Sequence, residues 1–147
     1  MRVVLDTNVL IRASPKASGP AREVLLSIAS GDHVLIMSGI LLQEVERVLS
    51  YPRVQKLWKM THKEIAAYLQ LLSSLSEMVQ LPAGKRIVPS DPDDDAVINT
   101  AVAGQAQILC TLDTHFFDPT VLTYCTQHGI RILTDIQLLR LIRSRQT

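Results

Sequence analysis

Long apolar runs and cysteine pairs are both scarce in this sequence. Apolar stretches such as residues 3–5 and 40–42 are far shorter than the roughly 18 residues that a membrane-spanning helix needs. Cys110 and Cys125 fit no CxxC or metal-knuckle spacing, and two cysteines are too few for a disulfide framework. We therefore expect a soluble protein that makes no membrane contact, with both cysteines reduced and filling space in the fold.

A secretory signal is absent as well. The sequence passes from Met1 through residues 2–5 directly into Asp6, which leaves no room for the apolar region and small-residue cleavage site of a signal peptide. This arrangement predicts a cytoplasmic location. Internal repeats are also absent, and 147 residues with 47% hydrophobic side chains suit one domain with a sizeable core. Residues 1–147 are therefore predicted to form a single domain.

What the sequence does contain is a series of short runs rich in valine, isoleucine and leucine. Residues 2–5, 33–37, 108–112 and 130–133 are continuous enough in apolar side chains to be strands buried on both faces. Residues 78–81 form a weaker fifth candidate.

Helical patterns with recognisable ends lie between these runs. Pro20 suits a first turn and Gly31 follows the end of the same pattern, while Thr61 stands three residues before Glu64, as in a capping box. The alternation of strands and helices predicts an α/β fold, a central parallel sheet with helices on both faces. The proline-rich segment 82–92 is expected to be a loop within the domain. Further helices are predicted over residues 40–49, from Asp95 to near Gly104, and from Thr134 with Gln137 onward.

Two acidic residues follow predicted strands. Asp6 comes after the strand 2–5, and Asp113 comes after the strand 108–112. Open α/β sheets bind ligands beyond the carboxyl ends of their strands, so the two acids are predicted to meet at one rim, on neighbouring strands. An aspartate after a strand is also a common turn residue, and for either acid alone that interpretation is equally good.

The position of Glu44 on its predicted helix distinguishes it from Glu46. At about 100° per residue, the apolar side chains of the segment 40–49 define a wide stripe that includes Glu44 and excludes Glu46. A carboxylate on the buried side needs a partner, because desolvating an unpaired charge is costly. Glu44 is therefore predicted to be a metal ligand or a structural ion-pair residue, and Glu46 a solvated surface residue.

The densest acidic segment is residues 91–95, where aspartate occupies every position except Pro92. Aspartate is a preferred helix N-cap and favours the positive end of the helix dipole, which explains one or two of these residues. Four mutually repelling acids destabilise a fold without a cation, so the segment predicts a metal ion nearby. The acids have no matched histidine or cysteine ligands, so they favour Mg²⁺ or Mn²⁺ over zinc.

In this order and spacing, the acids resemble those of the PIN domains, and within that family the VapC-like toxins of toxin–antitoxin pairs. The resemblance covers nearly the whole chain, through Asp6-Thr7-Asn8, Ser38 followed by Glu44, the acidic run 91–95, and Thr111-Leu112-Asp113. It implies a metal-dependent ribonuclease whose catalytic and metal-binding acids are Asp6, Glu44, Asp95 and Asp113. Its implied supporting residues are Asn8 and Thr111, with Asp91 and Asp94 as alternatives to Asp95.

The same resemblance implies Mg²⁺ or Mn²⁺ as the cofactor, RNA as the substrate and a cognate antitoxin as the protein partner. A carboxylate-held metal can neutralise the phosphodiester and lower the pKa of its bound water. In-line attack would then leave a 5′-phosphate and a 3′-hydroxyl. The chain departs from the family after Asp113, where residues 114–117 replace the basic or acidic pair that often follows. Substrate preference is therefore open, and a homodimer is compatible with the sequence.

Cations and aromatic side chains alternate in residues 51–63, which contain no acid. Arg53, Lys56 and Lys59 are candidates for phosphate contacts, and Trp58 is a candidate for stacking on a base. A solvated helical hairpin, or a groove that grips an antitoxin, explains the segment equally well. The formal net charge of +1 favours no partner by itself, but a metal site that absorbs four acids leaves a mildly cationic frame around it.

Two other functions account for part of the pattern. A haloacid-dehalogenase-like phosphatase also begins with a strand that ends in aspartate, but it needs a second aspartate two residues later, where this chain has Asn8. A catalytically silent PIN scaffold that binds RNA or a protein partner would not need all four acids. The ribonuclease is therefore the favoured interpretation.

Overall fold

The fold is built on a five-stranded sheet whose strands are all parallel, in the order β3-β2-β1-β4-β5. The computed structural model describes residues 1–81 and 92–146, and the side chains of these residues except 92–95. The strands are β1 (Arg2–Leu5), β2 (Val34–Ser38), β3 (Ser76–Val79), β4 (Ile108–Cys110) and β5 (Arg131–Leu133). The predicted parallel α/β architecture is thus confirmed.

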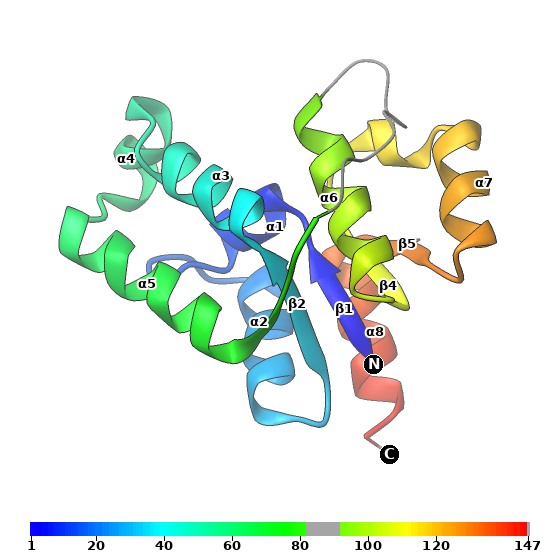
Figure 1. The fold of residues 1–147 in the computed structure, drawn as a ribbon. Helices are drawn as coiled ribbons and strands as arrows, with labels where there is room; N and C mark the ends of the chain where they lie inside the picture. The colour runs from blue at the N-terminus through cyan, green and yellow to red at the C-terminus, as the bar shows by residue number, and fades with distance from the viewer. Residues whose placement is uncertain (82–91, 147) are drawn as a thin grey trace.

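Helices fill every connection between the strands. Between β1 and β2 lie α1 (Thr7–Arg12) and α2 (Pro20–Ser30), and between β2 and β3 lie α3 (Gly39–Leu49), α4 (Pro52–Trp58) and α5 (His62–Leu75). Before β4 lies α6 (Pro92–Ala103), before β5 lie the 3-10 helix η1 (Thr114–Phe117) and α7 (Pro119–Gln127), and α8 (Asp135–Ser144) follows. In Figure 1, α6 packs in front of the sheet on β1, β2 and β4, while α2 and α8 pack together behind it.

Local start signals account for several helix ends. The predicted capping boxes are present, with Thr61 and Glu64 at the start of α5 and Thr134 and Gln137 at the start of α8. The helix predicted to open at Asp95 instead begins at Pro92, because a proline at the first helical position sacrifices no hydrogen bond. The sequence therefore predicted the start of α6 three residues too far along the chain.

Each of the five predicted strands is present, but their ends differ in places from the prediction. The weak candidate 78–81 is the edge strand β3, displaced to residues 76–79, where two of the four side chains are exposed. The strand predicted over 108–112 ends at Cys110. Of the predicted loop 82–92, Pro92 belongs to α6, and residues 82–91 lie outside the described residues.

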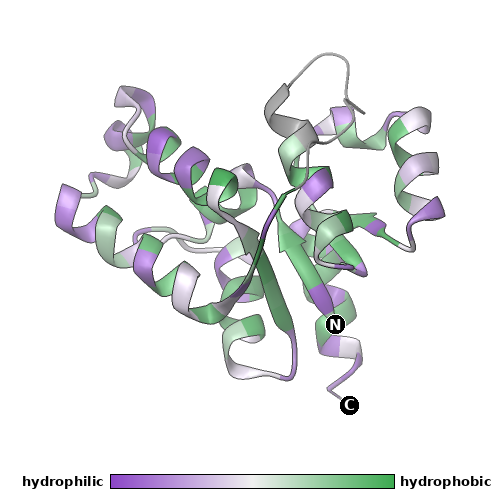
Figure 2. Ribbon diagram, in the orientation of Figure 1, coloured by the Kyte–Doolittle hydropathy of each residue, from purple (hydrophilic) through white to green (hydrophobic). Residues whose placement is uncertain are grey.

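The core lies on both faces of the central strands, which are hydrophobic along most of their length in Figure 2. Val3, Val4 and Leu5 of β1 are fully buried. Cys110 and Cys125 are free and buried, as predicted. Burial raises the pKa of Cys125 to about 11 and that of Cys110 further, so both thiols stay protonated and unreactive at neutral pH. No helix within residues 1–81 and 92–146 is long and apolar enough to cross a membrane.

Gly104, just after α6, marks a close approach between that helix and the sheet. A β-carbon at this position would lie 2.5 Å from Cγ2 and 3.0 Å from Cδ1 of Ile36, a side chain that is fully buried on β2. The Gly104 carbonyl also accepts hydrogen bonds from Nε (2.9 Å) and Nη2 (2.7 Å) of Arg2. The end of α6 is therefore fixed against both β1 and β2.

We expect Gly104→Ala to lower the free energy of unfolding by about 1–3 kcal/mol, because the added methyl group overpacks a dense core. Gly39→Ala is the matched control, since the β-carbon that it adds meets no atom within 4 Å. It should be neutral or stabilise by up to about 1 kcal/mol. Urea unfolding of both variants measures the difference, and equal stabilities would show that α6 can move away from Ile36.

Candidate functional site

The order in which the chain adds strands to the sheet reverses at β1. The chain runs outward from β1 through β2 to β3, then returns to the other side of β1 to form β4 and β5. Open parallel sheets bind ligands beyond the carboxyl ends of their strands at such a switch point. β1 and β4 are direct neighbours, with Leu5 paired to Cys110, as the sequence predicted. Asp6 and the segment that follows β4 therefore lie side by side at this edge.

Asp6 is a buried carboxylate, only 4% exposed. It is the N-cap of α1, and its Oδ1 accepts a hydrogen bond from the backbone N–H of Thr7 at 2.7 Å. Its Oδ2 accepts from the Thr111 hydroxyl at 2.7 Å and from the side-chain amide of Asn8 at 3.2 Å. These three donors are neutral groups that fix the orientation of the carboxylate.

Thr111 joins Asp6 to the Asp113 segment. Its side chain is fully buried, and its hydroxyl donates to Asp6 while accepting from the backbone N–H of Asp113 at 3.0 Å. Asn8 makes a second link, because its amide donates to Asp6 and its Oδ1 accepts from the backbone N–H of Leu112 at 3.2 Å. The two supporting residues named from the sequence thus lie between the two acidic segments.

Asp113 is more open than Asp6. It lies three residues beyond the end of β4 and caps η1, with its Oδ1 accepting from the backbone N–H of His115 at 3.0 Å. The imidazole Nδ1 of His115 lies 3.3 Å from the same oxygen. The Asp113 side chain is 26% exposed, so solvent and ligands can reach it.

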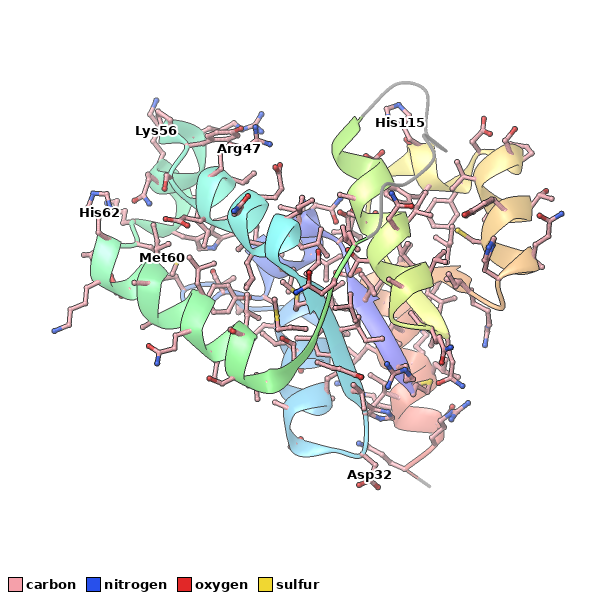
Figure 3. All side chains as sticks on the ribbon, in the orientation of Figure 1. Asp32, Arg47, Lys56, Met60, His62 and His115 are labelled. Atoms are coloured by element: carbon pink, nitrogen blue, oxygen red, sulfur yellow. The ribbon has the colours of Figure 1, made fainter. Side chains whose placement is uncertain are left out.

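Glu44 lies on α3, and its side chain is 18% exposed, whereas Glu46 is exposed, as the apolar stripe predicted. Its carboxylate pairs with Arg47, three residues later, whose side chain is itself half exposed. Figure 3 shows Arg47 on the α3 side and His115 on the η1 side of the end of the sheet where β1 stops.

A pair of buried hydroxyl side chains fixes the start of α3. Ser38 is the N-cap of α3, and its Oγ accepts from the backbone N–H of Leu41 at 3.4 Å. The same oxygen lies 2.8 Å from the hydroxyl of Thr100 on α6. Both hydroxyl side chains are buried, so the helix that carries Glu44 is attached to the helix that carries Asp95.

The remaining predicted acids lie on or before α6. Asp94 and Asp95 are within this helix, but their side chains, and all of Asp91, lie outside the described residues. Among the described residues, no three histidine, cysteine, aspartate or glutamate side chains are grouped so that they could hold a metal ion. The four-acid site therefore remains a prediction that depends on Asp95.

The candidate RNA-binding residues divide into two sets. Arg53, Lys56 and Lys59 are exposed on α4 and its C-cap, where Lys59 adopts a left-handed conformation with φ of 47°. Trp58 is instead half-buried and packs against the core. Its environment is therefore different from that of the cations beside it in sequence.

Sequence reasoning missed a second buried acid at the same edge of the sheet. Asp135 is 7% exposed and begins α8, directly after Thr134 and the end of β5. The pKa of Cys110 is raised first by burial and then by the negative charges of Asp135 and Asp6, so both acids act on one thiol. The available signal was its position after a predicted strand, the same signal that identified Asp6.

Thr111→Val keeps the shape of the side chain but removes the hydroxyl that serves Asp6 and Asp113. We expect it to lower the free energy of unfolding by about 1–3 kcal/mol, because a buried carboxylate loses a donor and a buried N–H loses its acceptor. Thr111→Ser should retain most of the stability. In a double-mutant cycle with Asp6→Ala, the coupling should be about 0.5–3 kcal/mol. A coupling of zero would show that the hydroxyl does not act on Asp6.

Comparison with known proteins agrees with this geometry. No curated protein matches the chain. Among solved structures, one chain of the crystal structure of VapBC2 from Rickettsia felis, bound to a DNA fragment from their promoter, shares the fold with a TM-score of 0.58. The two chains are 19% identical over 90% of this chain and 98% of the other. The family model of the PIN domain matches residues 2–115. The chain therefore belongs to the PIN-domain family.

Proposed function

We propose that this protein is a ribonuclease that hydrolyses RNA with Mg²⁺ or Mn²⁺ held by Asp6, Glu44, Asp95 and Asp113. The observation that carries the proposal is the Thr111 hydroxyl, which holds Asp6 and the Asp113 segment together at the switch point of the sheet. Nuclease chemistry is typical of the PIN family to which the chain belongs.

The donor set suits a hard divalent cation. All four proposed ligands are carboxylates, and oxygen-only sites select Mg²⁺, Mn²⁺ or Ca²⁺ over zinc. Asp6 is oriented by hydrogen bonds from three neutral groups, and carboxylate oxygens are ligands that hard cations prefer. Neighbouring carboxylates repel one another, and a bound divalent ion would relieve that repulsion.

Asp6, Asp113 and Glu44 would have distinct tasks in cleavage. A bound metal would neutralise a phosphate oxygen and lower the pKa of a water molecule. Asp6 would hold its position most rigidly, because its two oxygens are fixed by Thr7, Asn8 and Thr111. Asp113, partly exposed, would face the entering RNA. Glu44, whose carboxylate pairs with Arg47, would add its negative charge to the metal site.

We also propose that the protein is the toxin of a toxin–antitoxin pair, with a cognate antitoxin as its partner. The family resemblance and the fold shared with a chain of the VapBC2 complex support this role. The exposed cations Arg53, Lys56 and Lys59 would add phosphate contacts at a distance from the acids. A homodimer is a further assembly that the proposal accommodates.

The matched pair Glu44→Gln and Glu46→Gln tests the site. In saturating Mg²⁺, Glu44→Gln should cleave RNA about 100-fold or more slowly, because it removes a charge that acts on the reacting phosphate through the metal. Glu46→Gln should cleave like the parent. In chelator, both variants should unfold within about 1 kcal/mol of the parent, because an ion pair with a half-exposed arginine contributes little.

Controls separate this proposal from its alternatives. The parent should lose cleavage in excess EDTA and regain it when Mg²⁺ is restored. Cleavage by Glu44→Gln at the parental rate would remove Glu44 from the metal site, and full activity in EDTA would rule out the metal. RNA binding without cleavage in saturating Mg²⁺ would favour the catalytically silent scaffold.

A further inference from the structure

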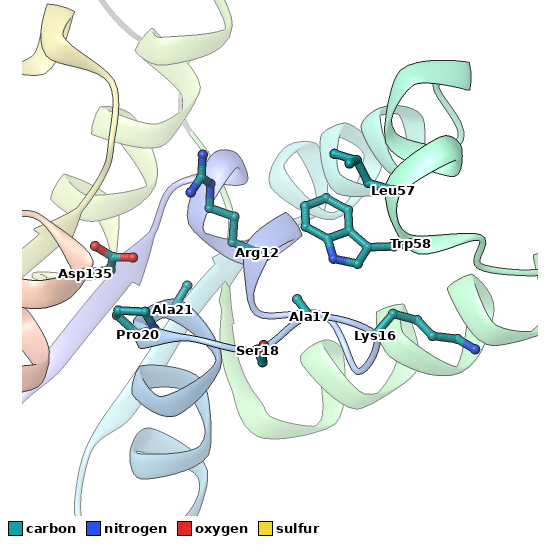
Figure 4. A pocket seen from close by; sticks show the side chains of 9 residues that line it. All are labelled: Arg12, Lys16, Ala17, Ser18, Pro20, Ala21, Leu57, Trp58 and Asp135. Atoms are coloured by element: carbon teal, nitrogen blue, oxygen red, sulfur yellow. The ribbon is translucent and has the colours of Figure 1, made fainter.

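A groove of about 390 Å³ lies between the connection from α1 to α2, the end of α4 and the start of α8. Its chemically distinctive lining comes from separate parts of the chain, with Arg12 and Lys16 at one segment, Leu57 and Trp58 at another, and Asp135 at a third. Figure 4 shows Arg12 and Trp58 reaching into the same space from α1 and α4, with Asp135 on the other side of the groove from Trp58. A ligand of the groove must therefore complement the cations, the indole and the buried acid.

Trp58 offers a flat aromatic wall. Its side chain is half-buried, and its indole N–H makes no hydrogen bond within residues 1–81 and 92–146. The neighbouring Leu57 is 69% exposed. An indole that packs on one side and is open on the other suits stacking with a nucleobase, a contact that depends little on base identity.

Arg12 is the cation of the groove that can bind an anion. It is exposed and makes no hydrogen bond or ion pair with any described residue. Lys16, by contrast, lies 3.0 Å from Glu64 and points toward α5 in Figure 4. Arg12 ends the helix that Asp6 begins, so at 1.5 Å per residue the two lie about 9 Å apart along the axis. This distance places a phosphate at Arg12 within one or two nucleotides of Asp6.

Asp135 sets the third requirement. It is 7% exposed, and its Oδ1 accepts from the backbone N–H of Ile136 at 2.8 Å. No other donor among the described residues reaches this carboxylate, although it lines the groove. A carboxylate can only accept hydrogen bonds, so an occupant must bring N–H groups to it. Guanine is the nucleobase whose Watson–Crick edge offers two adjacent N–H donors, from the ring and from the exocyclic amine.

We propose that this groove is a subsite for one unpaired guanine nucleotide of single-stranded RNA. The base stacks on Trp58 and donates to Asp135, and its phosphate binds Arg12. This inference rests on the proposed ribonuclease function, since it concerns the substrate of the same site. A basic side chain of a partner protein could also stack on Trp58 and donate to Asp135, but it would meet repulsion from Arg12. A nucleotide brings a negative phosphate to that residue instead, so the charges favour RNA.

The chain contains a single tryptophan, so its fluorescence reports on the groove directly. The experiment titrates the full chain, in EDTA so that no RNA is cut, with guanosine and uridine 5′-monophosphates. It then uses short oligouridylates with or without one guanosine. We expect saturable quenching, with guanine-containing probes binding about tenfold more tightly than those without it. Asp135→Asn should abolish this preference. Arg12→Gln should weaken the binding of every probe and reduce the slope of log affinity against log salt concentration by about one.

Arg131→Gln is the matched control, because Arg131 is an exposed arginine at the amino end of β5, at the opposite edge of the sheet. It should bind like the parent. Absence of saturable quenching, or equal binding by the parent, Arg12→Gln and Asp135→Asn, would overturn the subsite. Quenching by an arginine-rich peptide but not by RNA would assign the groove to a protein partner. RNA cleavage without quenching would contradict the subsite alone. Quenching without cleavage would contradict the proposed catalysis and support the subsite.

Discussion

The hydroxyl of Thr111 is the contact on which the geometry of this site depends. Parallel pairing of β1 and β4 brings Asp6 and the Asp113 segment to one edge of the sheet, but pairing alone does not fix their side chains. The hydroxyl donates to the Asp6 carboxylate and accepts from the Asp113 backbone, and it is fully buried. Burying a hydroxyl is costly unless its hydrogen bonds are made, so this arrangement favours one position for the Asp6 carboxylate and for the backbone of Asp113.

A pair of buried hydroxyls joins two of the helices in a similar way. The bond between Ser38 and Thr100 attaches α3 to α6, the helices that carry Glu44 and Asp95. The four acids of the proposed site are thereby carried by one scaffold, and their mutual repulsion would favour a bound cation. Rigid elements hold catalytic groups more accurately than loops do. A bound RNA strand would extend from the proposed acids toward the groove beside Arg12.

Much of the fold followed from the sequence because its information is local. Central strands buried on both faces appear as continuous apolar runs, and helical geometry alone separated Glu44 from Glu46. The strand β3 was harder, since an edge strand with exposed side chains has a weak apolar pattern. Asp135 follows a predicted strand, but the groove that it lines could not be foreseen from the sequence. Only tertiary packing brings the end of α1, the end of α4 and the start of α8 around one space.

The central claim is that Asp6, held by Thr111, is a ligand of the divalent ion that cleavage requires. Titration of the full chain with Mn²⁺, followed by electron paramagnetic resonance of the free ion, measures this binding without RNA. The parent should bind Mn²⁺ saturably, and Asp6→Asn, which keeps the shape of the side chain but removes its charge, should bind at least about tenfold more weakly. Equal Mn²⁺ affinity in the parent and Asp6→Asn would contradict the claim.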